Sequence, residues 1–363
     1  MARDWSWRVE KLRHILRPPT LGKIALRRVG EHDWTRAAEP PFSTDAGRHS
    51  VDTILIVGVE TVVGANLAVG LSEERRVVGL SRDRKVALQG VEVSFLASES
   101  ESAVRNALAT AAPGRVILCG AAARSCWEEV DGAAVAGCVD AAECWARAAA
   151  EAGIPLTVIS SDAVFSGPWM FHRENSTSLC NSAEAAAIRS MEERVLEIVP
   201  SALVVRTNAY GWSPTGDAGW LESTLSAVAA RTMSTTDCLR HATPILATDL
   251  VPLLQDAWTH DLQGVYHISG SERTNPVQFI EALADQFELP VPLRCRVEPL
   301  SIRPEGFGRG ETSLHTKKIR KALDVALPTV VEGLARLRSQ QLTGFADRIH
   351  PTMKLEPARS RVA

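Results

Sequence analysis

From residue 51 onward, the order of apolar and polar positions predicts strands and helices that alternate along the chain. Short apolar runs without a polar face are typical of strands buried on both sides, and segments with apolar residues at helical spacing separate them. We expect strands at Ile54–Val57, Arg76–Ser81, Val91–Phe95, Arg115–Gly120, Pro155–Ser160, Ala202–Arg206 and Gly264–Ser269. We expect helices after Gly64 and at Asp140–Ala152, Asn181–Ile198, Ala247–Trp258, Pro276–Phe287 and Val330–Arg338. This alternation predicts an α/β fold, a Rossmann-like, doubly wound parallel sheet with helices on both faces.

The same pattern predicts how the globular part is divided. The alternation covers residues 51–338, and the strands concentrate in a nucleotide-binding core at 51–207 with 246–269. A smaller C-terminal substrate lobe is expected mainly at 208–245 and 270–316.

The two ends of the chain differ from this part. Residues 1–50 predict a basic amphipathic helix, with an apolar face from Trp5 to Leu16, and then a linker. This extension either packs on its own domain or docks on a partner or a membrane surface. Residues 339–363 have no clear apolar period and predict a mobile tail.

A glycine loop follows the first expected strand. Gly58 ends that strand, and Gly64 opens the helix with Val63 before it. Strand, glycine turn and helix are typical of a site that binds a dinucleotide pyrophosphate at the helix N-terminus. Thr61 stands where the middle glycine of the usual three would be, so a side chain is expected to crowd the approach to the phosphates.

Composition narrows the function further. The net charge of −3 argues against a general nucleic-acid binder. The seven cysteines contain no C-x-x-C pair, and no His pair has ligand spacing, which favours reduced thiols over disulfides or a metal site. No apolar run reaches the about 18 residues that a membrane helix needs. We therefore expect a cytoplasmic protein without a metal.

Five further pieces resemble one known family in order and spacing. They are VISSDAVFSG (Val158–Gly167), VRTNAYG (Val205–Gly211), TPILATDLVPLL (Thr243–Leu254), GVYHISGS (Gly264–Ser271) and the stretch Glu311–Ala335. Over about residues 52–338 the chain resembles the dTDP-4-dehydrorhamnose reductases, which are extended short-chain dehydrogenases/reductases. The resemblance implies an NADP- or NAD-dependent reduction of a keto group on a nucleotide-activated sugar. Some relatives are instead non-catalytic regulatory subunits.

The residues that perform this chemistry in the family are only partly present. The resemblance implies a serine or threonine that holds the substrate oxygen, a tyrosine that gives the proton and a lysine four residues later. Ser161 keeps the first role, but the tyrosine position falls on Glu184 and the lysine position on Ile188. The sequence has two tyrosines and no lysine at 86–316, so no Y-x-x-x-K exists, and only Lys317 or Lys318 could fold back. Glu184 is interpreted as the N3 residue of a capping box with Asn181, or as a substitute acid; Ile188 has core spacing.

The resemblance also implies residues for the cofactor and the substrate. Arg82 would suit a 2′-phosphate, hence NADP over NAD, unless it is solvated surface charge. The small-residue turn that would pass along the cofactor is Gly120, Ala121 and Ala122. Candidate substrate residues are Asp162, Val164, His172, Arg206, Asn208 and Tyr210, although exposed loop polarity is the simpler explanation for His172.

Three functions stay open on this basis. The leading hypothesis is a degenerate family member, a pseudoenzyme that binds NAD(P) or a nucleotide-activated sugar and acts as a binding or regulatory subunit. The second is an active NADPH-dependent reductase that uses Ser161 and either Glu184 or a water relay. The third is a scaffold that works through the N-terminal helix. A protein partner and a homodimer are both compatible with the first hypothesis.

Overall fold

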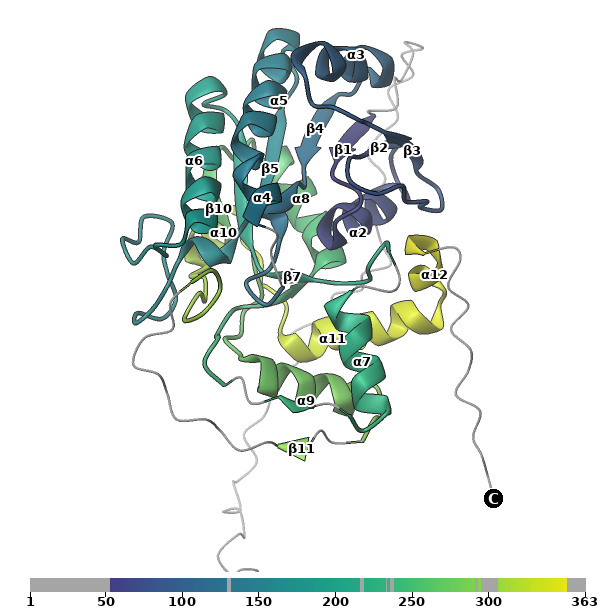
Figure 1. The fold of residues 1–363 in the computed structure, drawn as a ribbon, viewed down its shortest axis with the longest axis vertical. Coiled ribbons are helices and arrows are strands. Elements are labelled where there is room, and N and C mark those ends of the chain that lie inside the picture. The colour runs from purple at the N-terminus through teal and green to yellow at the C-terminus, as the bar shows by residue number, and fades with distance from the viewer. Residues whose placement is uncertain are drawn as a thin grey trace, which may run out of the picture. The chain divides into compact units, whose positions relative to one another are not determined.

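The computed structural model describes residues 53–128, 132–215, 219–232, 234–235, 238–290, 293–294 and 306–350, all within one compact unit, Ser50–Ala363. Seven parallel strands form its central sheet in the order β10-β6-β5-β4-β1-β2-β3 (Figure 1). They are β1 (Ile54–Val57), β2 (Val77–Ser81), β3 (Glu92–Phe95), β4 (Arg115–Leu118), β5 (Leu156–Ser161), β6 (Leu203–Thr207) and β10 (Gly264–His267). The seven expected strands and the doubly wound sheet are confirmed, with strand ends within two residues of the prediction.

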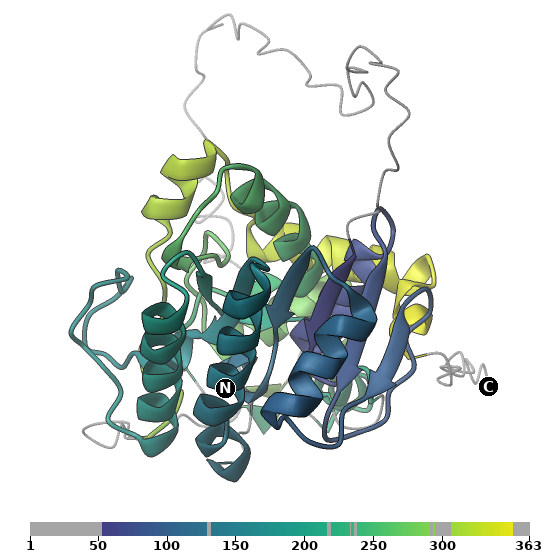
Figure 2. The same ribbon diagram turned by 90° about the horizontal axis from the view of Figure 1, so that it is seen from above.

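Helices cover both faces of the sheet, and Figure 2 shows one helical layer in front of the strands. One layer contains α3 (Glu101–Ala111), α4 (Gly132–Ala136), α5 (Cys138–Ala152) and α6 (Ala183–Ile198), and the other contains α2 (Val62–Leu71) and α8 (Leu250–Thr259). Alternate residues of β1 serve the two layers: Leu55 packs with α3 and α5, whereas Ile56 packs with α2 and α8. This two-sided burial is why the strands are apolar throughout.

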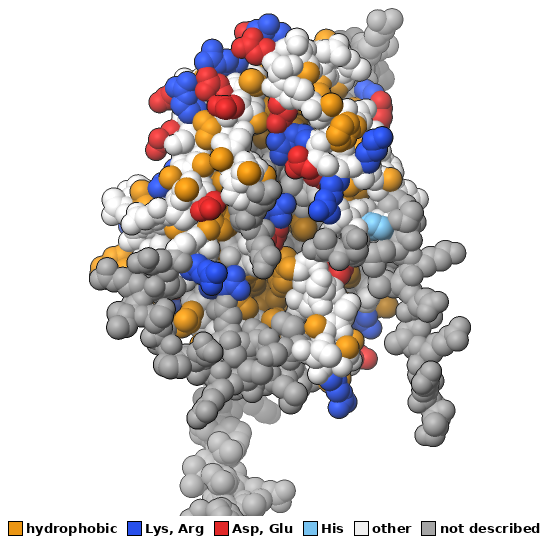
Figure 3. Space-filling view, viewed as in Figure 1, with side chains coloured by type: hydrophobic (Ala, Val, Ile, Leu, Met, Phe, Trp, Pro, Cys, Tyr) orange, Lys and Arg blue, Asp and Glu red, His pale blue; other side chains and the backbone are white. Residues whose placement is uncertain are grey.

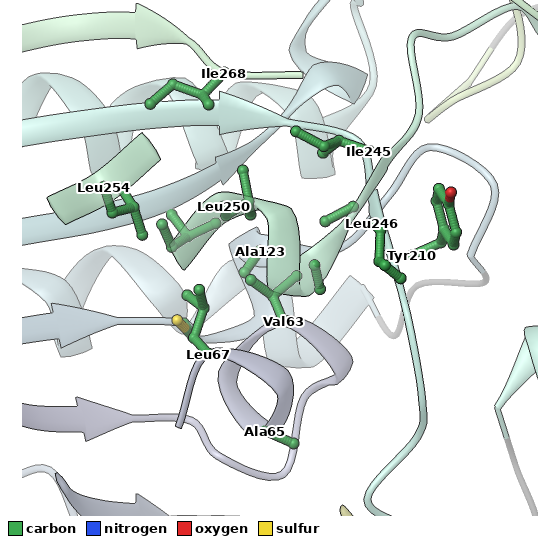
Figure 4. Packing of buried hydrophobic residues seen from close by; sticks show 14 of the residues in the cluster. Val63, Ala65, Leu67, Ala123, Tyr210, Ile245, Leu246, Leu250, Leu254 and Ile268 are labelled. Atoms are coloured by element: carbon green, nitrogen blue, oxygen red, sulfur yellow. The ribbon is translucent and has the colours of Figure 1, made fainter. Parts of the chain in front are cut away.

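Helix α2 fixes the position of the glycine loop. Eight of its ten residues are buried. Val63 and Leu67 point into an apolar cluster with Leu250 and Leu254 of α8 (Figure 4). The N-terminus of α2 is therefore held rigidly at the carboxyl end of β1.

The remaining elements lie beyond that end of the sheet or along its edges. Helices α7 (Trp220–Ala229), α9 (Pro276–Gln286) and α11 (Val330–Leu342) gather below the sheet in Figure 1. The short strands pair as β7 (Ala209–Tyr210) with β9 (Ile245–Leu246), and β8 (Ser234–Thr235) with β11 (Leu293–Arg294). Helices α10 (Lys317–Leu323) and α12 (Phe345–Ile349) complete the described chain, with short 3₁₀ turns η1 (Ala121–Ala123), η2 (Asp162–Val164) and η3 (Ala247–Asp249). No helix in these ranges is long and apolar enough to span a membrane.

The structure describes part of the C-terminal segment that was predicted to be a mobile tail. The mobile tail predicted from residue 339 is wrong up to residue 350, because α11 continues to Leu342 and α12 follows it. Ile349 is fully buried in the core, and Arg348 pairs with Glu73 after α2. The rest of the tail and the N-terminal extension lie outside the described residues.

The start of α6 also differs from the prediction. Its N-cap is Ser182, whose hydroxyl accepts a hydrogen bond from the Ala185 amide. Asn181 precedes the cap, so Glu184 stands one position too early for the capping box that we expected.

Candidate nucleotide-binding site

A cleft of about 580 Å³ opens at the carboxyl ends of the strands, beside the point where β1 separates β4 from β2. Its walls come from the glycine loop, the loop after β2, the segment after β4 and the start of α7. The face drawn in Figure 3 is hollowed between the sheet and the lower helices, with acidic, basic and apolar side chains around the hollow. Open α/β sheets bind their ligands at such a switch point.

The backbone of the glycine loop has the conformation that the sequence predicted. Gly58 has φ of +91°, and a Cβ there would lie 2.3 Å from the carbonyl oxygen of Cys119. A Cβ on Gly64 would lie 2.2 Å from the carbonyl oxygen of Gly58. Both positions therefore require glycine.

Thr61 is accommodated differently from our expectation. It is the N-cap of α2, and its hydroxyl accepts a hydrogen bond from the Gly64 amide at 3.0 Å. The same hydroxyl lies 2.8 Å from the Gly58 carbonyl oxygen and 3.0 Å from that of Cys119. The oxygen is thus turned into the loop, where it satisfies one amide that would otherwise be free for an anion.

Glu60, which the sequence analysis missed, introduces a buried charge into this loop. Its side chain is 6% exposed, and no side chain of the described residues donates a hydrogen bond to its carboxylate. The backbone amides of Glu60 and Arg82 face the carboxylate and lower its pKa in part. The nearest cation is Arg82, whose Nε lies 3.6 Å from one oxygen. Burial raises the pKa of Glu60 above its ordinary value.

Arg82 is neither a free phosphate ligand nor solvated surface charge. Its guanidinium is 18% exposed and donates to Glu99 at 2.7 Å. The other oxygen of Glu99 accepts from the indole N–H of Trp145 at 2.9 Å. The guanidinium also lies over Gly120, where an added Cβ would be 3.3 Å from it.

The small-residue turn after β4 lies beside this ion pair. Ala121 and Ala122 are buried in η1, and Ala122 and Gly120 line a cavity of about 30 Å³ together with Arg82 and Glu99. The Arg82–Glu99 ion pair therefore lies directly beside the turn.

The positions that correspond to the family's catalytic residues do not form a proton-donating pair. Ser161 ends β5 fully buried, and its hydroxyl accepts from the Ala163 amide at 3.0 Å. Glu184 is half-buried beside Gly132, and Ile188 is fully buried in the core, as its spacing predicted. Lys318 does not fold back to the cleft, because its Nζ donates to the Val265 carbonyl at 2.6 Å and stacks on Tyr266.

Asp162 and Asn208, two predicted substrate residues, are brought together but are sealed inside the protein. Asp162 is fully buried and accepts hydrogen bonds from Asn208 at 2.8 Å, Thr312 at 2.6 Å and the Cys126 amide at 3.1 Å. Burial raises the pKa of Asp162, and these hydrogen bonds act in the opposite direction. Val164 beside it packs in the core of the α5–α6 layer.

Arg206 was predicted to meet the substrate, and its contacts are instead internal. Its guanidinium pairs with Glu192 at 2.6 Å, with side-chain exposures of 9% and 3%. Ser160 donates to the same carboxylate at 2.5 Å. Because the partner comes from α6, fourteen residues away, the sequence pattern could not reveal it.

His172 and Tyr210 are also core residues. His172 is buried, stacks on Phe165 at 4.7 Å and places Nε2 3.1 Å from the Glu311 carbonyl oxygen, so exposed loop polarity was the wrong expectation. Tyr210 packs edge-on against Phe279 and approaches α11 at Gly333. Burial raises the pKa of its phenol.

Glu128 is the second acidic residue of the cleft that sequence reasoning missed. It lines the cleft with Trp127, and its carboxylate lies 3.6 Å from Arg124. Burial raises the pKa of Glu128 to about 7, so its carboxyl carries a proton part of the time at neutral pH. A glutamate shortly after a buried strand end was the available signal.

The sheet order, the glycine turn at β1 and the cleft at the switch point define a Rossmann-fold protein of the extended short-chain dehydrogenase/reductase class. Residues 52–342 match the family model described as the RmlD substrate binding domain, and the chain belongs to this family. No curated protein sequence matches the chain significantly.

Solved structures show the same fold at low sequence identity. The dTDP-4-dehydrorhamnose reductase from Bacillus anthracis, solved with NADP, superposes with a TM-score of 0.67 at 19% identity, covering 81% of this chain and 100% of that one. WbmH from Bordetella bronchiseptica, solved with NAD+, gives 0.63 at 15% identity, with coverages of 79% and 97%. UDP-glucose 4-epimerase from Thermotoga maritima, solved with UDP-glucose, gives 0.63 at 16% identity, with coverages of 80% and 99%. The fold is therefore that of NAD(P)-binding nucleotide-sugar reductases and epimerases.

Proposed function

We propose that this protein binds a nucleotide-activated sugar, lacks the usual reductase chemistry of its family and serves as a binding or regulatory subunit. The observation that carries the proposal is the absence of a phenol beside an ammonium near Ser161 in the described part of the chain. Of the two tyrosines, Tyr210 is buried in the core and Tyr266 lies at the sheet edge under Lys318. Ile188 occupies the lysine position.

This absence matters because the reduction of a carbonyl group requires both a hydride and a proton. A hydride comes from the nicotinamide, and a proton must reach the developing alkoxide at the same carbonyl. Glu184 is a weak substitute for the missing proton donor, because it is not one of the described residues that line the cleft. The scaffold is thus kept while the proton donor of the family is lost.

The cleft still suits a nucleotide ligand. Its volume of about 580 Å³ lies in the range of small-molecule sites, and Trp127 and Trp220 give it aromatic walls. The structural neighbours solved with NADP, NAD+ or UDP-glucose support a ligand of this class. The glycine loop fits a pyrophosphate in its backbone but not in its charge, because Glu60 is acidic and Arg82 is already paired with Glu99. A nucleotide sugar would therefore place its diphosphate in the cleft away from this loop.

The direct test is an assay of NADPH oxidation with dTDP-4-keto-6-deoxy sugars. We expect the wild-type protein to consume no more NADPH than its Ser161→Ala variant, because no positioned acid completes the reaction. A rate that the wild type shows and Ser161→Ala loses would contradict the proposal, and Glu184→Gln then tests whether Glu184 is the acid. Circular dichroism of each variant establishes that it is folded.

One observation favours a second candidate, an active reductase with a non-standard acid. Glu128 lies in the cleft with its pKa raised to about 7, which suits a general acid at neutral pH. On this alternative, activity would fall about 10²–10⁴-fold in Glu128→Gln and would survive in Glu184→Gln. Equal activity in the two variants would dispose of it.

A further inference from the structure

We propose that Glu60 acts as an internal anion at the glycine loop, so that Glu60 and Arg82 together disfavour a pyrophosphate on this loop, where a dinucleotide would have to place it. The inference concerns the cofactor end of the same cleft and rests on the proposal that this cleft is a nucleotide site. It assigns to two residues a selectivity that the fold alone does not have.

The first step of the argument is the position of Glu60. In a doubly wound sheet the pyrophosphate rests on the first βα turn, where free amides and the helix dipole favour negative charge. Glu60 directly precedes Thr61, the N-cap of α2, and lines the cleft. The chain therefore places a carboxylate of its own next to the N-terminus of α2.

The second step is that this carboxylate is buried without a side-chain donor. Its side chain is 6% exposed, no side chain of the described residues donates to it, and the backbone amides of Glu60 and Arg82 offset its burial only in part. A buried charge that is compensated only in part is costly, and its persistence in a folded protein requires an explanation. A role in selecting the ligand of the cleft supplies one, because a second anion brought to the same turn would face this charge through a poorly solvated medium.

The third step is that the positive charge of Arg82 is already balanced by neighbouring carboxylates. Glu99 binds its guanidinium at 2.7 Å, and Glu60 lies 3.6 Å from its Nε. Two carboxylates thus surround one cation, which leaves this group of side chains with a net negative charge before any ligand arrives. A dinucleotide would add further negative charge there.

The experiment is a calorimetric titration of NAD+ and of NADP+ into the wild-type protein and Glu60→Gln. The amide keeps the shape of the side chain and removes its charge, so we expect affinity for both dinucleotides to rise at least about tenfold. The control is Glu74→Gln, which removes an exposed carboxylate outside the cleft that accepts a hydrogen bond from Gln255. We expect Glu74→Gln to change affinity by less than about twofold.

Two results would overturn the proposal: equal affinities of wild type and Glu60→Gln, or the same gain in Glu74→Gln, which would indicate general charge and not Glu60. Should Glu60→Gln fail to fold, Glu128→Gln provides a second measurement, because it removes the other carboxyl of the cleft whose pKa is raised. Its affinity for NAD+ should rise as pH is lowered over the range in which the protein stays folded, because burial raises the pKa of Glu60, which faces Arg82, Asp83 and the Cys119 thiol. An affinity that stays constant or falls over this range would also refute the proposal.

Binding of a dTDP- or UDP-sugar to the wild type separates this inference from the proposed function. If the sugar nucleotide binds and Glu60→Gln gains nothing for dinucleotides, the role of Glu60 is wrong and the proposed function stands. If the sugar nucleotide does not bind, the proposed function fails, whatever Glu60→Gln shows.

Discussion

Two buried acidic centres lie at the carboxyl ends of the strands, and they differ in how their charge is satisfied. After β5, Asp162 accepts hydrogen bonds from four donors, and Glu192 nearby binds both Arg206 and Ser160. After β1, Glu60 has no side-chain donor among the described residues and shares Arg82 with Glu99. A satisfied centre holds the fold together, whereas an unsatisfied one in an open cleft influences which ligand can enter.

The strongest way to break the satisfied centre is Arg206→Ala. Loss of the guanidinium would leave Glu192 buried without its countercharge, so we expect a loss of about 3–5 kcal/mol in unfolding free energy, measured by urea denaturation. The control is Arg194→Ala, because Arg194 pairs with Glu143 and Glu197 on the exposed surface, where such pairs contribute little to stability. Similar losses in the two variants would contradict the buried role of Arg206.

A smaller effect is expected from Thr312→Val. The substitution keeps the shape of the side chain and removes one of the donors to Asp162, so the unfolding free energy should fall by about 1–3 kcal/mol. Thr259→Val is the control, because that exposed hydroxyl bonds only a carbonyl within its own helix. A neutral Thr312→Val would mean that Asp162 does not depend on its full set of donors.

Glu128 predicts a pH dependence at the cleft. Its pKa is raised to about 7 in the folded protein, so the stability associated with its protonated form is present at acidic pH and is lost as pH rises through about 7. Glu128→Gln should therefore raise the thermal unfolding midpoint at pH about 8 and change it little at pH about 4. An equal effect at both pH values would show that burial does not raise this pKa.

The smallest change in unfolding free energy is expected at the acidic centre after β1. Glu60→Gln removes a buried charge that lacks a side-chain donor among the described residues, while Arg82 keeps Glu99. We expect a gain of about 1 kcal/mol in unfolding free energy at pH about 8, by the same denaturation measurement. A clear loss would indicate that Glu60 is needed to pair Arg82.

The sequence predicted the sheet better than the site, and particular residues show why. Strands such as β1 are apolar on both sides, which is visible locally, and the glycines of its loop have a direct geometric cause. The partners of Arg206 and His172 come from other elements, so the sequence could not distinguish a free side chain from a committed one.

The sequence also contains two acidic residues near the glycine loop and Arg82 that the prediction of the site did not use. Glu60 stands between the two loop glycines, where any carboxylate is unusual for a phosphate site, and Glu99 follows β3 within reach of Arg82. Helix α12 was missed because it has five residues, too few for a helical period.

The most direct test of this account is a thermal-shift comparison of nucleotide sugars with NAD+ and NADP+ on the wild-type protein. A ligand at 100 times its dissociation constant adds about 2.7 kcal/mol to stability, which shifts the unfolding midpoint measurably. The account predicts a shift with a dTDP- or UDP-sugar and none with either dinucleotide at the same concentration. A shift with NADP+ or NAD+ as large as that with the sugar nucleotide would contradict it.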